Sequence, residues 1–169
     1  GTYTLDETFL LTAEDSGTED AKVVWKAVPG AAAVIESSTA AALFAIYDAR
    51  HIQIAGLQFV GASAQAIEIA YCHSVTIEGC HVRNSGHTGL HLYGGESCRV
   101  ENCVFEDCDW TGIRVEAGSR QTLVGCRHLL EQNIRRRCGT IRHSLSSAIH
   151  VVGVGCHVND NEIAECEHT

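Results

Sequence analysis

Short alternating runs of hydrophobic and polar residues recur along this chain at a fixed interval of 23 residues. The clearest two copies are AIEIAYCHSVTIEGCHVRNSGHT at residues 66–88 and GLHLYGGESCRVENCVFEDCDWT at residues 89–111. Further copies keep the same apolar positions: Phe44, Ile67, Leu90 and Ile113, then Ile46, Ile69, Leu92 and Val115. A constant period of this size with short apolar runs is typical of a solenoid, in which each repeat packs on its neighbours.

Each copy contains three short strand-like segments separated by turns. The sequence therefore predicts an all-β fold, a right-handed parallel β-helix with about 23 residues per coil and three short strands per coil. An antiparallel sandwich would need hairpin turn signals and would not keep a constant period. A leucine-rich repeat would need its own leucine spacing, which is absent.

The regularity of the repeat divides the chain into two parts. Residues 1–42 predict irregular β segments that form the first coils, and residues 43–169 predict regular coils. A fifth copy starts at Ala148 after 13 extra residues, which we place in a loop insertion near 130–147. The chain stops at Thr169, where the next coil should begin, so we expect a truncated piece of a longer β-helix. An uncapped coil exposes strand edges, which predicts end-to-end self-association.

One turn column has the residue types that tolerate a left-handed backbone: Gly56, Gly79, Asn102, Gly125 and Asp160. The following column, Leu57, Cys80, Cys103, Cys126 and Asn161, is expected to point inward and to stack three thiols about 4.8 Å apart. Such thiols could serve metal or redox chemistry. We interpret them as small buried hydrophobic residues.

Charge and cysteine usage exclude several classes of partner and site. A net charge of −9 argues against nucleic acid and against an anionic membrane surface. No apolar run approaches the length of a membrane span. The nine cysteines include no CxxC pair, so the sequence predicts neither a disulfide framework nor a zinc knuckle.

The first strand of each coil presents outward side chains that predict a binding face. One outward column is Ala45, Glu68, His91, Arg114 and His150, the next is Tyr47, Ala70, Tyr93, Glu116 and Val152, and nearby loops add His87, Asp109, Trp110 and His168. From these we select Glu68, His91, Tyr93, Asp109, Trp110, Arg114, Glu116 and His150 as candidate substrate-binding residues. Coils about 4.8 Å apart repeat on nearly the scale of a sugar residue, and aromatic rings stack on sugars.

Glu68 beside His91 or Arg114 could act as an acid or base, because neighbouring charges tune proton affinity. The alternative is a solvated face whose charges pair across coils, Glu68 with His91 and Arg114 with Glu116.

Two other segments have candidate chemistry. The acidic residues 106–109 could hold calcium, but a strand scatters their side chains, and His87 and His91 have a ligand spacing that suits a helix rather than a turn and a strand. The sequence therefore predicts no metal site and no cofactor. The basic residues Arg135, Arg136 and Arg137, with Arg142 and His143, could bind a uronic acid or sulfated sugar, or could pair with Glu106, Asp107 and Glu131. A disulfide between Cys108 and Cys138 is also possible, since their coils are adjacent.

The whole chain resembles the right-handed parallel β-helix superfamily of pectate-lyase-like proteins. LTAEDSGTEDAKVVWKAVPGAAAVI (residues 11–35) and TIRHSLSSAIHVVGVGCHVNDNEIAECEHT (residues 140–169) are similar to bacterial β-helix glycoside hydrolases of the α-L-fucosidase and xylanase type. In such enzymes the resemblance implies a pair of catalytic carboxylates further along the helix. No motif here matches that pair, so no catalytic residue is assigned.

The resemblance implies that the chain is the β-helix portion of a secreted or periplasmic bacterial glycoside hydrolase, with a polysaccharide or oligosaccharide as its partner. Two alternatives remain: a non-catalytic glycan-binding or adhesin-type β-helix, and a polysaccharide lyase acting on uronic acids. Because the catalytic carboxylates are not in view, we expect the chain itself to bind glycan weakly and to show no turnover.

Overall fold

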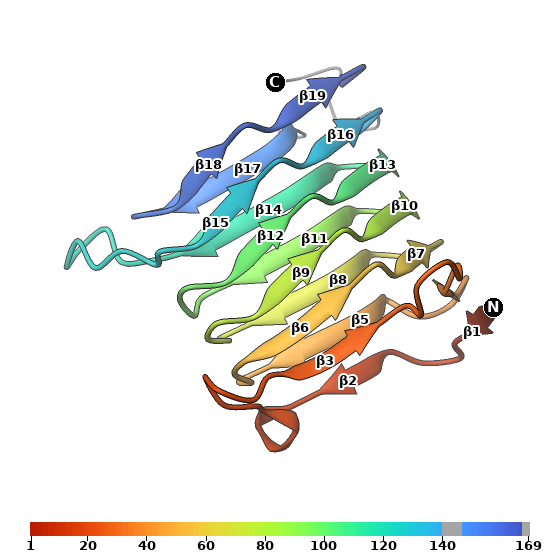
Figure 1. The fold of residues 1–169 in the computed structure, drawn as a ribbon. Helices are drawn as coiled ribbons and strands as arrows, with labels where there is room; N and C mark the ends of the chain where they lie inside the picture. The colour runs from red at the N-terminus through yellow and green to blue at the C-terminus, as the bar shows by residue number, and fades with distance from the viewer. Residues whose placement is uncertain (140–146, 167–169) are drawn as a thin grey trace.

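The computed structural model describes residues 1–139 and 147–166, which form a stack of coils built from three parallel sheets (Figure 1). Sheet B holds β2 (Phe9–Leu11), β5 (Ala42–Tyr47), β8 (Gln65–Ala70), β11 (Thr88–Tyr93), β14 (Thr111–Ala117) and β17 (Ser147–Gly153). Sheet C holds β3 (Val23–Lys26), β6 (Ile52–Ala55), β9 (Thr76–Glu78), β12 (Arg99–Glu101), β15 (Leu129–Glu131) and β18 (His157–Asn159). Sheet A holds β1 (Thr2–Thr4), β4 (Val34–Glu36), β7 (Gln58–Val60), β10 (His81–Ser85), β13 (Val104–Cys108), β16 (Ile134–Arg136) and β19 (Glu162–Ala164).

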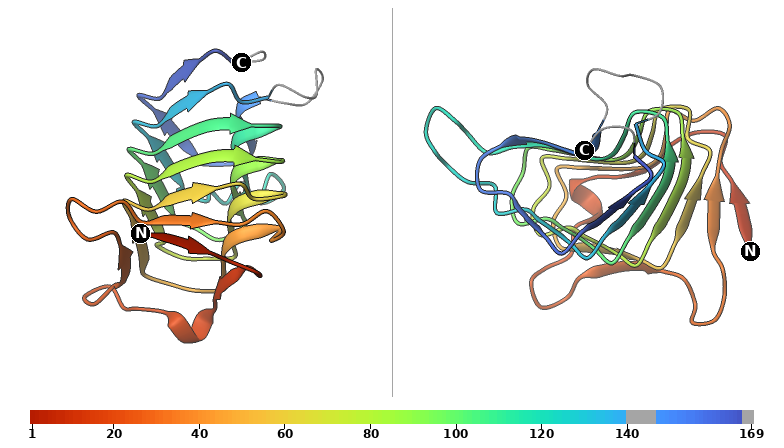
Figure 2. Two further views of the ribbon diagram at one scale, coloured as in Figure 1. Left: turned by 90° about the vertical axis from the view of Figure 1, so that its right-hand side faces the viewer. Right: turned by 90° about the horizontal axis from the view of Figure 1, so that it is seen from above.

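Each coil runs through sheet B, sheet C and sheet A in turn, and the coils superimpose when viewed along the stack (Figure 2). Ile67 pairs with Phe44 on one side and with Leu90 on the other, so the 23-residue step of the sequence is the register of sheet B. The predicted all-β parallel β-helix with three strands per coil is confirmed. The first 42 residues also join these sheets, through β1 to β4.

The core is a set of stacked columns that run along the axis. Ile69, Ile77 and Val82 from one coil, and their equivalents above and below, are almost fully buried. Equivalent apolar side chains stack on one another, so each coil covers the apolar side chains of the next. This burial between coils supplies the hydrophobic stabilisation of a solenoid. In the last coil Val151, Val158 and Ile163 are each about 40 % exposed (39 %, 43 % and 40 %).

Tight turns between the sheets need a left-handed backbone at fixed positions. The predicted column is confirmed at Gly56, Gly79, Asn102 and Asp160, whose φ values are 65°, 57°, 55° and 49°. In the coil formed by β14, β15 and β16, the residue with the left-handed backbone is Gln132, with φ of 54°, and the assignment of Gly125 was wrong.

The coil formed by β14, β15 and β16 departs from the expected register. Val100 pairs with Leu130, whereas the constant step would have matched it with Leu123, which is 76 % exposed. Strand β16 and most of β15 therefore lie in the range where the sequence placed an insertion, 130–147. The extra residues are divided between a projecting loop at 118–128 (Figure 2) and the connection after Arg136, part of which lies outside the described residues.

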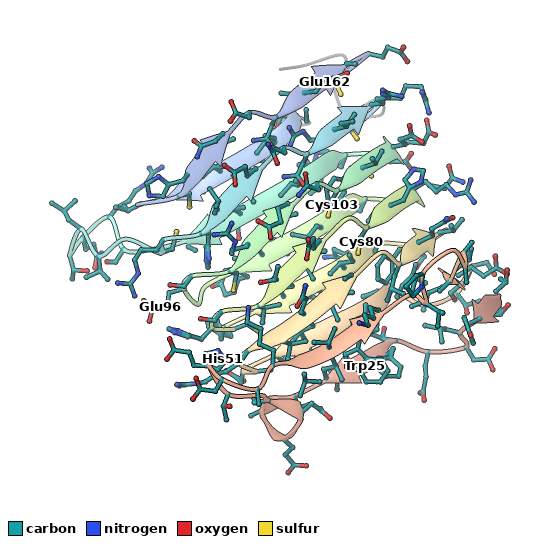
Figure 3. The ribbon with its side chains drawn as sticks, viewed as in Figure 1. Trp25, His51, Cys80, Glu96, Cys103 and Glu162 are labelled. Carbon is teal, nitrogen blue, oxygen red and sulfur yellow. The ribbon has the colours of Figure 1, made fainter. Side chains whose placement is uncertain are left out.

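The predicted stack of three thiols is a stack of two. Cys80 and Cys103 lie on neighbouring coils (Figure 3), and Asn133 occupies the place that was assigned to Cys126. Asn133 accepts a hydrogen bond from the Cys103 N–H at 3.0 Å, and its amide donates to Asn161 Oδ1 at 3.1 Å. The column thus changes from thiols to an asparagine ladder, in which buried amides are satisfied across coils.

The helical structure among the described residues is one short 3₁₀ turn at Ala13–Asp15, capped by Thr12. Within residues 1–139 and 147–166 the structure has no helix that is long and apolar enough to cross a membrane.

Candidate functional site

The outward face of sheet B brings the predicted columns together. Glu68, His91, Arg114 and His150 pair in register on β8, β11, β14 and β17, so their side chains follow one another along the stack. Tyr93 pairs with Glu116 in the neighbouring column. Successive side chains of a strand point to opposite faces of the sheet, so the residues that alternate with these, such as Leu92 and Val115, point inward and are buried. We call the surface made by these six side chains the sheet B face.

At the N-terminal end of the sheet B face, Glu68 accepts a hydrogen bond from Tyr47. The Tyr47 hydroxyl donates to Glu68 Oε2 at 2.9 Å, and this contact joins two adjacent coils. Burial, together with the hydrogen bond to Glu68, raises the pKa of Tyr47. Glu68 does not form the ion pair with His91 that the pairing alternative had expected; among the described residues its side chain bonds to Tyr47.

At the centre of the sheet B face, Arg114 and Glu116 form an ion pair within β14. Arg114 Nε lies 2.9 Å from Glu116 Oε1, and Nη2 contacts the same oxygen. The hydrogen bonds from Arg114 lower the pKa of Glu116, so this carboxylate stays ionised. The expected pairing of Arg114 with Glu116 is confirmed, although the two residues share one strand rather than two coils.

His91 lies against the same carboxylate without a hydrogen bond. Its Nε2 is 3.7 Å from Glu116 Oε2 and is covered from solvent. Burial, assisted by the Arg114 charge, lowers the pKa of His91, although Glu116 opposes the shift. His91 is therefore a neutral imidazole near pH 7. His150 lies on the next strand beyond Arg114, where its charge contributes to the lowered pKa of Glu116.

The Trp110 ring lies against the Arg114 guanidinium. Its Cζ lies 5.5 Å from the centre of the Trp110 ring, and the Trp110 and His87 rings contact at 3.9 Å between centroids. Trp110 and Asp109 directly follow β13, where the Asp109 N–H bonds to the Ser85 carbonyl. The loop before β14 therefore carries Trp110 to the edge of the sheet B face, as the sequence had predicted.

Tyr71 is an aromatic neighbour that the sequence analysis missed. It is 59 % exposed and forms an edge-on contact with Tyr93, with 5.2 Å between ring centroids. A hydrogen bond with Tyr93 raises the pKa of Tyr71. Its left-handed φ of 56° places it in a turn after β8, outside the strand alternation from which the outward residues were selected.

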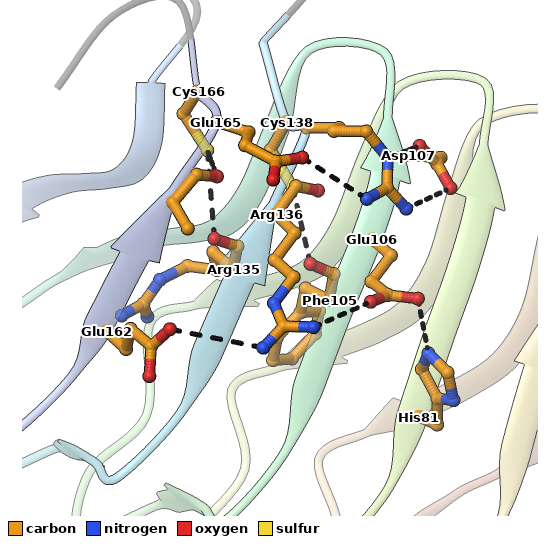
Figure 4. Close-up of polar contacts among 12 residues, drawn as sticks. His81, Phe105, Glu106, Asp107, Arg135, Arg136, Cys138, Glu162, Glu165 and Cys166 are labelled. Atoms are coloured by element: carbon orange, nitrogen blue, oxygen red, sulfur yellow. Dashed lines mark hydrogen bonds and ion pairs between the residues drawn. The ribbon is translucent and has the colours of Figure 1, made fainter.

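The basic segment 135–137 does not form a patch available to an anionic sugar (Figure 4). Arg136 lies 3.9 Å from Glu106 and 4.0 Å from Glu162, and Arg137 holds both Asp107 oxygens at 2.6 and 3.0 Å. Arg135 points inward and is fully buried. Pairing with Glu106 and Asp107 was one of the two interpretations left open, and the structure supports it. Arg142 and His143 lie outside the described residues.

Two acidic residues of the segment 106–109 already have side-chain partners, since Glu106 contacts His81 at 3.1 Å and Asp107 pairs with Arg137. In the part of the chain that the structure describes, no three His, Cys, Asp or Glu side chains converge as a metal site. Cys108 and Cys138 are free thiols that donate to the carbonyls of Glu106 and of Phe105 and Arg136.

Comparisons with known proteins agree with this architecture. Residues 42–169 match the family model described as a right handed beta helix region. A crystal structure of an alginate lyase from Paenibacillus sp. str. FPU-7 superimposes with a TM-score of 0.73 at 15 % sequence identity, covering 96 % of this chain and 56 % of that one. The chain thus spans little more than half the length of that protein. The search of curated proteins found no match.

Proposed function

Since the chain belongs to the right-handed β-helix family, we propose that its sheet B face binds an acidic polysaccharide, and that the protein acts on uronic-acid chains as a polysaccharide lyase. This proposal takes the lyase alternative of the sequence analysis in place of the glycoside hydrolase. The solved alginate lyase, a protein that by its name acts on a uronic-acid polysaccharide, supports the proposal only by its fold.

One observation carries the proposal. His91, Arg114 and His150 stack in register on three consecutive strands, in a chain whose net charge is −9. In this column the Arg114 guanidinium lies between His150 and the neutral His91, and a guanidinium on the face of an otherwise acidic protein favours a ligand that carries carboxylates. Coils stack about 4.8 Å apart, close to the length of one sugar residue, so successive carboxylates can meet successive coils.

Aromatic side chains supply the complementary apolar surface. Tyr93 is 40 % exposed next to this column, and Trp110 lies under the Arg114 guanidinium. Aromatic rings stack on the apolar faces of sugar rings, and an arginine positioned over such a ring keeps its planar fork oriented toward an anion. The sheet B face therefore combines the two kinds of contact that a uronic-acid chain offers.

A hydrolytic mechanism fits this face less well. A glycosidase needs one carboxylic acid that stays protonated to donate to the leaving oxygen, and such a group has a raised pKa. The pKa of Glu116 is lowered by Arg114, which is the opposite direction. Glu116 is suited to fix the guanidinium in place instead.

Elimination needs a different set of groups. A base removes the proton next to the uronate carboxylate, a cation stabilises the charge that develops on that carboxylate, and the bond to the glycosidic oxygen then breaks. Arg114 is suited to the cation's role. For the base we propose His150, because the Nε2 atom of His91 is covered by its neighbours.

The test is incubation of the chain with sodium alginate and with polygalacturonate, with xylan as a neutral control. A lyase product contains a new carbon–carbon double bond conjugated to the carboxylate, so ultraviolet absorbance should rise together with the number of reducing ends. Reducing ends without absorbance would indicate hydrolysis and overturn the lyase proposal. Binding without either product would indicate the non-catalytic glycan-binding function.

Variants locate the binding site. Arg114→Gln should weaken retention of the protein in an alginate-containing gel by roughly tenfold, because an arginine–carboxylate contact contributes about 1.5 to 3 kcal/mol. Arg137→Gln is the matched control, since that guanidinium is also paired with a carboxylate, Asp107, but belongs to sheet A and not to the sheet B face. Equal retention of the Arg114 variant and the unmodified chain would exclude the sheet B face as the binding surface.

A further inference from the structure

We propose that Cys126 and Cys156 form a reversible disulfide that fastens the loop at 118–128 to the fifth coil. Their Sγ atoms lie 2.9 Å apart, about 0.9 Å more than the bonded distance of roughly 2.0 Å. The two residues come from different coils and are 30 positions apart in the chain.

The backbone around the pair is built for close approach. The Cys126 N–H donates to the Val154 carbonyl at 2.8 Å, which holds the two segments at the separation of paired strands. Paired strands lie about 4.8 Å apart, within the range of Cα separations that a disulfide spans. A Cβ on Gly155 would lie 2.8 Å from the Gly125 Cα, so two glycines permit the contact immediately before the two cysteines.

The other seven cysteines all donate to backbone carbonyls, and among them Cys80 with Cys103 and Cys108 with Cys138 also hydrogen-bond through their thiols. Each of them directs its thiol to a backbone carbonyl, usually that of the residue two positions earlier, as Cys103 does with Glu101 at 3.2 Å. Cys72, Cys80, Cys98, Cys108, Cys138 and Cys166 show the same pattern. In the described part of the chain, the contact recorded for the Cys126 and Cys156 thiols is the one with each other.

Exposure favours Cys156 as the first thiol to react, although burial and its contact with Cys126 raise the pKa of Cys156 to about 12. Cys156 is half-buried, whereas Cys126 is only 2 % exposed. With glutathione disulfide as the oxidant, the Cys156 thiolate attacks one sulfur and releases one glutathione thiolate. The Cys126 thiolate then attacks the Cys156 sulfur of the mixed disulfide and releases the second. The two thiol protons pass to the two released thiolates, so one disulfide is consumed and one is formed.

The bond would join two segments that border the sheet B face. The loop at 118–128 directly follows β14, which carries Arg114 and Glu116, and Cys156 follows β17, which carries His150. A covalent link would hold this loop against the turn after β17. The inference rests on the contact of the two sulfurs and does not depend on the proposed function.

Peptide mapping tests the pair directly. Cleavage after arginine yields a peptide of residues 121–127 with Cys126 as its single cysteine, and a peptide of residues 143–169 with Cys156 and Cys166. Use of the Cys166→Ser variant makes the second peptide unambiguous. After incubation with glutathione disulfide and blocking of free thiols, the two peptides should be recovered as one linked species that separates on reduction.

Three outcomes are distinguishable. Linkage of 121–127 to 143–169 in Cys166→Ser, and its loss in Cys156→Ser, supports the proposal. Glutathione retained on Cys156 without linkage, or equal linkage among the other cysteines, overturns it. As a second readout, oxidation should raise the unfolding temperature of the Cys166→Ser protein and leave that of Cys156→Ser unchanged; an equal response of both proteins also overturns it.

Discussion

Arg135 stacks in register on Phe105 at the inner side of sheet A, so a guanidinium continues a column of aromatic and aliphatic side chains. Within residues 1–139 and 147–166 its Nε and Nη1 atoms have no hydrogen-bond partner, and Nη2 reaches the Asn133 carbonyl at 3.4 Å. Burial lowers the pKa of Arg135 to about 10. Gly112 provides the space, because a Cβ there would lie 3.0 Å from the Arg135 Cγ.

Replacement of this arginine by an apolar residue is expected to stabilise the fold. Arg135→Leu removes a buried, poorly paired charge, which should raise the free energy of unfolding by about 1 to 3 kcal/mol. Urea denaturation followed by circular dichroism measures the change. The matched control is Arg136→Leu, a neighbouring arginine that is half-buried and ion-paired, where a loss of less than about 1 kcal/mol is expected. A clear loss of stability in Arg135→Leu would mean that the guanidinium has a partner that stabilises the fold.

His128 makes the stability of the fold depend on pH. This fully buried imidazole accepts a hydrogen bond from the Cys98 N–H at Nδ1 and contacts the Gly94 carbonyl through Nε2 at 3.0 Å. Nδ1 therefore has no room for a proton, and burial lowers the pKa of His128 below 6.5. Between the lowered value and 6.5 the unfolded chain binds more protons than the folded one, so stability is retained above pH 6.5 and declines as pH falls.

His128→Asn should flatten this decline, since Asn133 Oδ1 accepts the Cys103 N–H in the same way one turn further on. The measurement is the urea midpoint at several pH values between about 7 and 5. Asn133→Ala serves as the control: it removes no titratable group, so it should lower stability by about 1 to 3 kcal/mol at every pH and leave the slope unchanged. The same slope in His128→Asn and the parent chain would contradict the assignment.

Trp110 is expected to contribute to glycan binding through both its ring face and Arg114. Trp110→Leu removes the surface over which the guanidinium lies at 5.5 Å, and should weaken binding to alginate roughly five- to tenfold. Affinity gel electrophoresis or calorimetry measures the change. Tyr3→Leu, which alters an aromatic residue that is 61 % exposed on β1, should bind as the parent chain does. Parallel loss in both variants would point to a general loss of structure.

Arg137 should matter for local electrostatics and not for glycan binding. The Arg137 guanidinium lowers the pKa of Asp107, so the pair is intact above pH 3.8 and its contribution disappears as pH falls below that value. We expect Arg137→Gln to have a small effect on the urea midpoint at neutral pH, which decreases further at high salt. A salt-independent effect would indicate a role beyond this surface pair.

The repeat and the sheet B face could be read from the sequence because each depends on short-range regularity. Alternation sends Ile67 and Ile69 inward and Glu68 outward, and the constant step carries that assignment from β8 to β11 and β14. Left-handed turns need residues of particular types, which made Gly56, Gly79 and Asn102 recognisable.

Where insertions interrupt the 23-residue repeat, only the tertiary structure shows which residues pair between coils. The insertion at 118–128 shifts β15 and β16, so Leu123 matched the period but is exposed, while Leu130 fills the core. The same shift places Asn133 over Cys103 and brings Cys126 to Cys156. The sequence determined the coil and its faces, because local alternation encodes them. The structure determined which residue follows which along the axis, because contacts between coils select the register that fills the interior.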